Sequence, residues 1–133
     1  MKKKILIVDD EAPIRKLFAR IIGTDTYGIL PAASGAEALA LMQQAPVDLI
    51  LLDLNMPGLD GADTLVEMRK LDQDVPVFII TSFKDAFLDK LSALREAGIH
   101  FEVINKPVEK EQLRRIVKNT FKSKPSPIIA EMP

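Results

Sequence analysis

The sequence predicts an α/β protein with a doubly wound, five-stranded parallel sheet. Short apolar runs alternate with stretches of helical periodicity, and this alternation occurs five times in 133 residues. Parallel strands need crossover connections, which are right-handed and place helices on both faces of the sheet. The length suits one domain of ordinary size.

The composition excludes several classes of site. Hydrophobic residues make up 47% of the chain and charged residues 28%, which is a globular balance. The formal net charge of −1 gives no indication of direct binding to nucleic acid or to an anionic membrane. The chain has no cysteine, which excludes disulfides and thiolate metal ligands. Its single histidine, His100, excludes a zinc site built on paired histidines and is interpreted as a loop residue.

The first unit begins with the continuous apolar run Ile5–Val8, which is typical of a strand buried on both faces. This run is too short for a secretory signal or a membrane helix, so we expect a cytoplasmic protein without a membrane segment. Gly23 is a candidate helix stop. The helix before it is indicated by apolar residues at helical spacing: Ile14, Leu17, Phe18 and Ile21.

The second unit contains a weaker strand at Gly28–Ala33. Pro31 lies within it, and because proline cannot donate to a ladder, we expect this strand at an edge of the sheet. Ser34 is a candidate N-cap for a helix that extends to Gln44. Glu37, three residues later, would complete a capping box.

The third unit contains the strongly apolar strand Val47–Leu52, which leads to Asp53. The loop that follows has the sequence Asn-Met-Pro-Gly at positions 55–58. The helix after this loop is marked by Leu65, Met68 and Leu71.

The last two units place strands at Val75–Ile80 and Phe101–Ile104, with Gly98 as a stop for the helix between them. Apolar residues at helical spacing mark the two helices: Phe87, Leu88, Leu91 and Leu94 in the fourth unit, and Leu113, Ile116, Val117 and Phe121 in the fifth.

Polar residues follow four of the five predicted strands. In an open parallel sheet, ligands bind beyond the carboxyl ends of the strands, so these residues should meet at one rim. They are Asp9, Asp10 and Glu11 after the first strand, Asp53 after the third, Thr81 and Ser82 after the fourth, and Asn105 and Lys106 after the fifth.

This combination suits phosphoryl chemistry with a divalent cation. Clustered carboxylates repel one another, and Mg²⁺ prefers oxygen ligands. A carboxylate such as Asp53 can form an acyl phosphate. Lys106 could pair with that carboxylate at rest and with the phosphate afterwards, while Thr81 could donate to a phosphoryl oxygen.

Four segments of the chain resemble the receiver domain of two-component response regulators. They are Ile5–Glu11, Asp48–Gly61, Ile79–Ser82 and Asn105–Pro107, in the family's order and each at a strand end. The resemblance extends from about Lys4 to Phe121. It implies a flavodoxin-like fold with strand order 2-1-3-4-5, a receiver domain at residues 1–121, and a proline-containing tail or linker at residues 122–133.

The resemblance also implies a role for each site residue. Asp53 would be phosphorylated, with Thr81 and Lys106 bonding the phosphoryl group. Lys106-Pro107 would be a cis peptide. The Mg²⁺ ligands would be Asp10 and Asp53, the backbone carbonyl of Asn55, and Asp9 through the water shell.

The sequence departs from the family pattern near the last strand. The family usually has an aromatic residue three positions before the lysine, where this chain has Val103. Phe101 lies two residues earlier, and the stretch from Gly98 to Lys106 is about one residue long for the family, as a β-bulge would make it. The sequence leaves open whether Phe101 or Val103 takes the switch position. Ser82 and Phe83 are further departures beside the site.

We therefore expect a phosphoacceptor rather than an enzyme that turns over an external substrate. Its partners would be a sensor histidine kinase or a histidine phosphotransfer protein, and a downstream effector that the sequence does not identify. Fold analogy also allows a homodimer through the fourth helix, fifth strand and fifth helix. The alternatives are a non-switching interaction module and a small Mg²⁺-dependent phosphohydrolase.

Overall fold

The computed structural model describes residues 2–54, 61–82 and 85–122, with the side chains of residues 85–88 excepted. Five strands form one sheet in the order β2-β1-β3-β4-β5, and all neighbouring pairs are parallel. This confirms the predicted fold class and strand order. The strands are β1 (Lys4–Val8), β2 (Gly28–Ala32), β3 (Leu49–Asp53), β4 (Val77–Thr81) and β5 (Glu102–Asn105).

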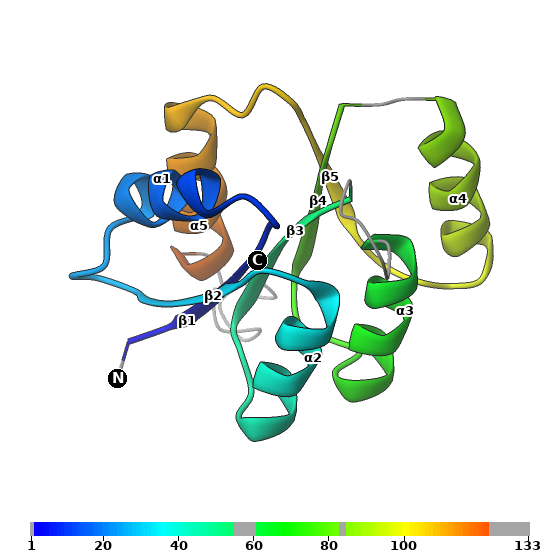
Figure 1. Ribbon diagram of the computed structural model, residues 1–133, viewed down its shortest axis with the longest axis horizontal. Coiled ribbons are helices and arrows are strands. Elements are labelled where there is room, and N and C mark those ends of the chain that lie inside the picture. The colour runs from blue at the N-terminus through cyan, green and yellow to red at the C-terminus, as the bar shows by residue number, and fades with distance from the viewer. Residues whose placement is uncertain (1, 55–60, 83–84, 123–133) are drawn as a thin grey trace, which may run out of the picture.

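Five helices cover the two faces of the sheet (Figure 1). Helices α1 and α5 pack together on one face, while α2, α3 and α4 lie on the other. The helices are α1 (Ala12–Ile22), α2 (Gly35–Gln44), α3 (Gly61–Leu71), α4 (Asp85–Glu96) and α5 (Lys110–Lys122). None of the described helices is long and apolar enough to cross a membrane.

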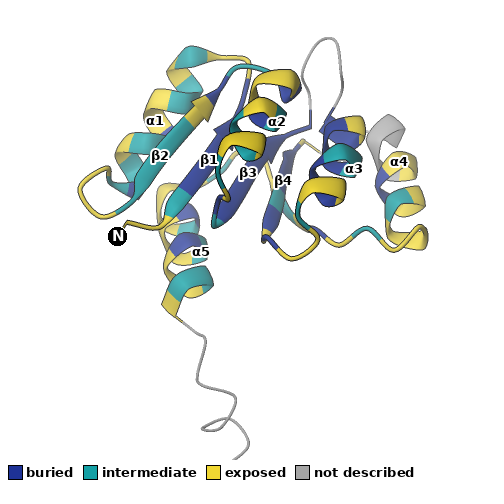
Figure 2. Ribbon diagram, turned by 90° about the horizontal axis from the view of Figure 1, so that it is seen from below, coloured by how far each residue is buried: buried dark blue, intermediate teal, exposed yellow. Residues whose placement is uncertain are grey.

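The central strands β1 and β3 are almost fully buried because helices cover both of their faces (Figure 2). Successive side chains of a strand point to opposite faces, so each strand contributes to two cores. In β1, Leu6 and Val8 face the core beneath α2 and α3, while Ile5 and Ile7 face the core beneath α1 and α5. This explains the continuous apolar run in the sequence.

Strand β2 lies at an edge of the sheet, as Pro31 predicts. The N–H of Gly28 donates to the Lys3 carbonyl (2.9 Å), and the carbonyl of Ala32 accepts from the N–H of Asp9 (3.1 Å). Alternate residues of a parallel strand bond to the same neighbour, so Gly28 and Ala32 face β1 and Pro31 faces away from it. The missing N–H of Pro31 therefore costs no ladder hydrogen bond.

Three of the predicted helix boundaries are confirmed. Gly23 follows α1 with a φ of 98°, and Gly98 follows α4 with a φ of 85°, in the left-handed region that favours glycine. The Ser34 hydroxyl accepts from the N–H of Glu37 (3.1 Å), as an N-cap should. The first residue of the predicted tail, Lys122, is the last residue of α5, and residues 123–133 lie outside the described residues.

Strands β3 and β4 each begin two residues later than the sequence predicts. Val47 and Val75 were included because they are apolar, and both are buried, but they precede the parallel ladder. Asp53 and Thr81 instead lie inside the strands as their last residues. The ladder pairs Asp53 with Ile80 and Thr81 with Asn105, so the sheet itself fixes the backbone of these polar residues.

Candidate functional site

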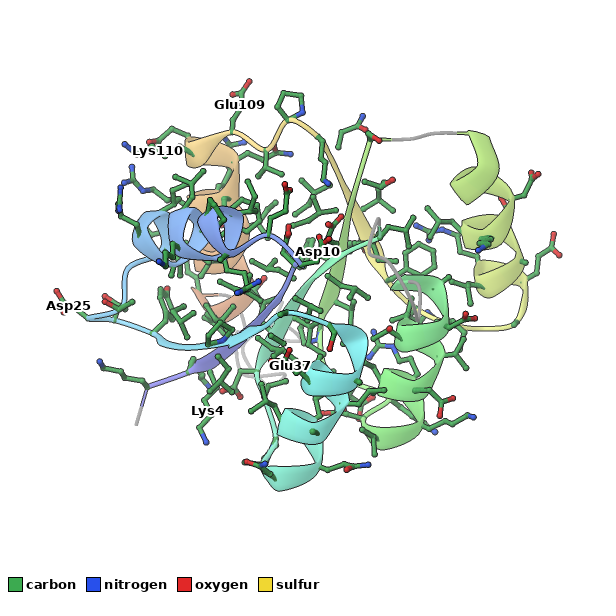
Figure 3. The ribbon with its side chains drawn as sticks, in the orientation of Figure 1. Lys4, Asp10, Asp25, Glu37, Glu109 and Lys110 are labelled. Atoms are coloured by element: carbon green, nitrogen blue, oxygen red, sulfur yellow. The ribbon has the colours of Figure 1, made fainter. Side chains whose placement is uncertain are left out.

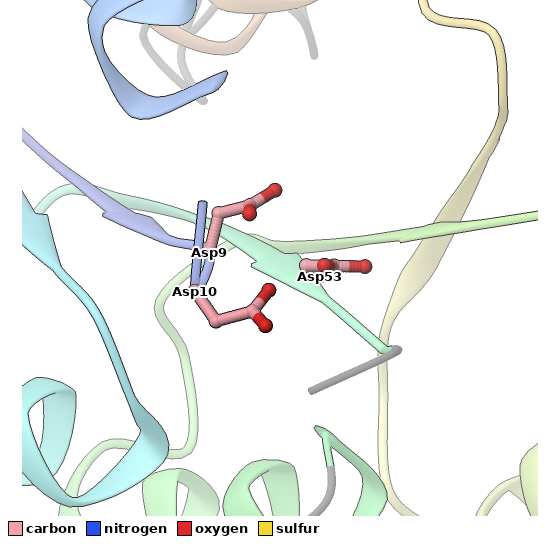
Figure 4. A group of neighbouring side chains, drawn as sticks. All are labelled: Asp9, Asp10 and Asp53. Carbon is pink, nitrogen blue, oxygen red and sulfur yellow. The ribbon is translucent and has the colours of Figure 1, made fainter. Parts of the chain in front are cut away.

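Three carboxylates converge beyond the carboxyl ends of β1 and β3. Asp9 and Asp10 directly follow β1, and Asp53 is the last residue of β3. Figure 3 shows Asp10 at the turn between β1 and α1. Val8 pairs with Leu52 in the ladder, so the next residues, Asp9 and Asp53, emerge side by side. Carboxylate oxygens of the three residues lie within 4.8 Å of one another (Figure 4).

Two of these carboxylates are buried. Asp9 is 4% exposed and Asp53 2% exposed, whereas Asp10 is open to solvent. Burial is the main cause that raises the pKa of Asp9, and the negative charges of Asp53 and Asp10 raise it further. A hydrogen bond from the N–H of Glu11 to Oδ1 of Asp9 (2.8 Å) and the charge of Lys106 oppose this shift in pKa. A cation at this site would therefore relieve a repulsion that the fold itself imposes.

Lys106 supplies the positive charge of the site. Its Nζ atom lies 3.1 Å from Oδ1 of Asp53, and the side chain remains 35% exposed. Its backbone N–H donates to the carbonyl of Thr81 (2.9 Å), which ties the residue after β5 to the end of β4. The Lys106-Pro107 peptide is cis, as predicted.

Thr81 is fully buried at the end of β4, next to the strand that carries Asp53. Ser82, the following residue, is exposed. The structure thus brings together the predicted site residues at the carboxyl ends of the strands: Asp9, Asp10, Asp53, Thr81 and Lys106. Asn55 and Phe83 lie outside the described residues.

The donor set suits a hard divalent cation such as Mg²⁺. All three converging side chains offer carboxylate oxygens, which Mg²⁺ prefers, and the described part of the cluster contains no nitrogen or sulfur ligand. One oxygen of Asp9 already accepts the Glu11 N–H, so Asp9 has its second oxygen to offer. The carboxylate of Asp10 is exposed, so it can give up its bound water to coordinate a cation.

Arg15 is a residue of the site that sequence reasoning missed. Its Nη1 atom donates to the backbone carbonyl of Asp9 at 2.7 Å, from the first turns of α1. This contact and the Glu11 N–H hold the backbone and the side chain of Asp9. No sequence pattern indicates this contact, because the partner of Arg15 is a main-chain oxygen, which every residue carries.

The structure shows the surroundings of Val103 and Phe101, the two candidates for the position that holds an aromatic residue in the family. Val103 is half-buried and packs against the core beneath α2 and α3. Phe101 precedes β5, is 5% exposed, and lies beneath the guanidinium of Arg95, which is 4.2 Å from the ring centroid. Strand β5 pairs with β4 in an unbroken register over residues 78–81 and 102–105, so the β-bulge considered above is not found in this ladder.

Comparison with known proteins agrees with this geometry. Residues 5–118 match the model of the response regulator receiver domain. The chain belongs to this family. Among its relatives is the sporulation initiation phosphotransferase F of Bacillus subtilis, which is 36% identical over 120 residues and matches over 89% of this chain and 93% of its own length.

Other relatives of this receiver domain are longer proteins. The probable transcriptional regulator ycf27 of Guillardia theta is 38% identical over 125 residues, which are 92% of this chain but 48% of that protein. The receiver domain thus spans about half the length of that regulator.

Solved structures show the same fold. The Vibrio cholerae chemotaxis protein CheY4 has a TM-score of 0.76 and 28% identity, over 91% of this receiver domain and all of that chain. A CheY-like receiver domain protein from Methanospirillum hungatei has a TM-score of 0.81 and 27% identity, over 92% of this chain and 95% of that one. Both confirm the flavodoxin-like assignment.

Proposed function

We propose that this receiver domain is a phosphoacceptor that takes a phosphoryl group on Asp53. The donor is the phosphohistidine of a sensor histidine kinase or of a histidine phosphotransfer protein. One observation carries the proposal: Asp53 lies within 4.8 Å of two further carboxylates and 3.1 Å from the ammonium of Lys106. The Bacillus subtilis relative is a phosphotransferase, which supports this proposal.

In the proposed reaction a carboxylate oxygen of Asp53 attacks the phosphorus of the donor. The new O–P bond forms as the P–N bond to the donor histidine breaks, and the bonding electron pair leaves with the imidazole nitrogen. Lys106 moves from the free carboxylate to a phosphoryl oxygen, and the Thr81 hydroxyl donates to another. The protein's contribution is in-line positioning and charge neutralisation, which dominate phosphoryl transfer.

Asp9, Asp10 and Asp53, together with the backbone carbonyl of Asn55, would hold a Mg²⁺ ion. When bound, this ion neutralises charge on the carboxylates and on the transferring phosphoryl group. The proposal of a Mg²⁺ site rests on the converging carboxylate oxygens and on the burial of Asp9, which raises the pKa of its carboxyl group.

We further propose that the added charge biases the surface formed by α4, β5 and α5, and that an effector protein reads this change. A homodimer through the same surface remains part of this proposal, as do a cytoplasmic location and a tail or linker role for residues 122–133. The chain would act as a phosphoacceptor and would at most catalyse its own phosphorylation and dephosphorylation.

Intact-mass analysis after incubation with acetyl phosphate and Mg²⁺ tests the proposal. We expect one added phosphoryl group on the parent. The Asp53→Asn variant and a sample with EDTA should gain none, because the first lacks the acceptor and the second lacks the cation. Phosphorylation of Asp53→Asn equal to that of the parent would refute the assignment of Asp53, and turnover of external phosphoesters would favour a phosphohydrolase.

A non-switching interaction module is the second candidate, and the residues around β5 favour it. The position three residues before Lys106 holds the aliphatic Val103, and the neighbouring aromatic ring of Phe101 is buried beneath Arg95. Amide spectra of the phosphorylated and unphosphorylated protein separate the two functions. Shifts across α4 and β5 indicate a switch, whereas spectra that change only around Asp53 indicate a fixed docking surface.

A further inference from the structure

We propose that Gly61 is a positioning residue for Asp53, and this inference rests on the proposed phosphoacceptor function. Gly61 is the first residue of α3 and is buried. A Cβ atom at this position would lie 2.7 Å from the Cα atom of Leu54 and 3.0 Å from the backbone carbonyl oxygen of Asp53. The start of α3 therefore packs directly against the main chain of the acceptor residue.

Contacts from β4 and α3 restrain this piece of main chain. Asp53 pairs with Ile80 of β4, the N–H of Leu54 donates to the carbonyl of Ile80 (3.0 Å), and the backbone of Gly61 lies against Leu54 and Asp53. Leu54 is itself 1% exposed, so its side chain has little room to move. The helix is equally constrained, because Leu65 and Met68 of α3 are fully buried in the core.

A methyl group at position 61 would consequently force a main-chain displacement. A contact of 2.7 Å to a backbone carbon cannot be relieved by rotating a side chain, so the end of β3 and the start of α3 must separate. The Asp53 carboxylate would then shift relative to Asp9, Asp10 and Lys106. Displacements of about 1 Å can slow a positioned reaction by about 100-fold.

Gly35 provides a matched control. It is also buried, it also begins a helix, and a Cβ atom there would clash with Oγ1 of Thr64 and lie 3.2 Å from Cβ of Thr64. That contact joins α2 to α3 and involves a side chain, not the main chain of β3. Gly35→Ala thus also introduces a clash with a residue of α3, but with the Thr64 side chain instead of the main chain at Asp53.

The experiment compares the parent, Gly61→Ala and Gly35→Ala. The three measurements are the rate of phosphorylation by acetyl phosphate from intact mass, the affinity for Mg²⁺ by calorimetric titration, and the unfolding midpoint in urea. We expect Gly61→Ala to react at least about tenfold more slowly than the parent and to bind Mg²⁺ more weakly. Gly35→Ala should lose stability but retain the parental rate and affinity within about twofold.

A rate for Gly61→Ala within twofold of the parent would overturn the inference, and so would equal slowing of both glycine variants. If Gly61→Ala does not fold, the double variant with Leu54→Val takes its place. It removes the 3.0 Å contact to Cδ1 of Leu54 but retains the contact to Cα, so it should still react slowly, and a parental rate would overturn the inference. If the parent itself takes no phosphoryl group, the proposed function fails, and the Mg²⁺ affinities of the two variants still decide the role of Gly61.

Discussion

Asp9 is a buried carboxyl group beside two other carboxylates, and burial is the largest cause of its raised pKa. A raised pKa in the folded state means that the folded protein holds this proton more tightly than the unfolded chain does. Stability then falls as the pH rises from the ordinary carboxyl pKa of 3.8 through the raised value, and the penalty persists at neutral pH.

Replacing Asp9 with Asn should therefore stabilise the metal-free protein at pH 7, by on the order of 1 kcal/mol. The Asn side-chain oxygen can still accept the Glu11 N–H, so the change removes charge without removing that hydrogen bond. Urea unfolding in EDTA measures the effect. The gain should shrink as the pH is lowered through the raised pKa of Asp9 toward 3.8, because the parent then takes up the proton as well, and a gain independent of pH would contradict this explanation.

Arg15→Ala should weaken Mg²⁺ binding by about tenfold, because losing a hydrogen bond that orients a metal ligand has an effect of this size. The guanidinium holds the Asp9 carbonyl at 2.7 Å, and without it the Asp9–Asp10 turn loses one restraint. Arg15→Lys retains a donor and should restore part of the affinity. Lys16→Ala, which removes a neighbouring exposed cation of α1, is the control for loss of charge alone. Equal affinities for the Arg15→Ala variant and this control would argue against a positioning role.

At the scale of elements, a buried arginine of α3 connects this helix to the loops that precede β4 and β5. Arg69 is 9% exposed, and burial lowers the pKa of its guanidinium. Its Nη1 atom donates to the Val75 carbonyl (2.7 Å), and Nη2 and Nε donate to the His100 carbonyl (2.7 and 3.1 Å). One side chain thus binds the loop before β4 and the loop before β5.

Arg69→Met should lower the free energy of unfolding by about 1–3 kcal/mol, since it leaves the buried Val75 carbonyl without this donor and removes the part-buried bonds to the His100 carbonyl. The methionine side chain fills much of the same volume, which isolates the loss of hydrogen bonds from a cavity effect. Lys70→Met is the matched control, because Lys70 is 68% exposed and its ion pair with Glu67 lies on the surface. Chemical unfolding measures the free energy of unfolding of both variants. If Arg69→Met and Lys70→Met lower it by similar amounts, the hydrogen bonds of Arg69 contribute little to stability.

The sequence predicted every strand and helix, and most of the site, because those features depend on residue type. Buried strands need apolar runs, an edge strand tolerates Pro31, and carboxylates and Lys106 follow strand ends. Arg15, Arg69 and Gly61 were not predicted because each acts on main-chain atoms of another strand or loop. A main-chain partner leaves no mark in the sequence, so only the folded geometry reveals it.

At the scale of the whole molecule, the order of the strands could not be derived from periodicity. Five parallel strands can be arranged in many orders with similar apolar patterns, and the order 2-1-3-4-5 followed only from the resemblance of the motifs to a family. That order places β3 between β1 and β4, so a single rim receives Asp9, Asp53 and Thr81 from three adjacent strands.

Since the rim holds together only in the folded chain, Mg²⁺ should stabilise the protein as a whole. Above the dissociation constant, each tenfold rise in Mg²⁺ concentration should add about 1.4 kcal/mol to the free energy of unfolding. Thermal unfolding followed by circular dichroism measures this dependence. The midpoint of Asp53→Asn should depend less on Mg²⁺ concentration because this variant lacks one of the carboxylates. A parent whose unfolding midpoint does not change with Mg²⁺ concentration would argue against the metal site.

The contact between Tyr27 and Phe121 has a practical consequence. The chain contains one tyrosine and no tryptophan, so Tyr27 is the source of its intrinsic ultraviolet fluorescence. The ring of Tyr27 stands directly before β2, with its centroid 5.5 Å from that of Phe121 in α5 and the two planes tilted by 32°. The emission of Tyr27 should therefore change if the end of α5 moves away from the sheet, and this can be measured on the unmodified protein without an attached dye.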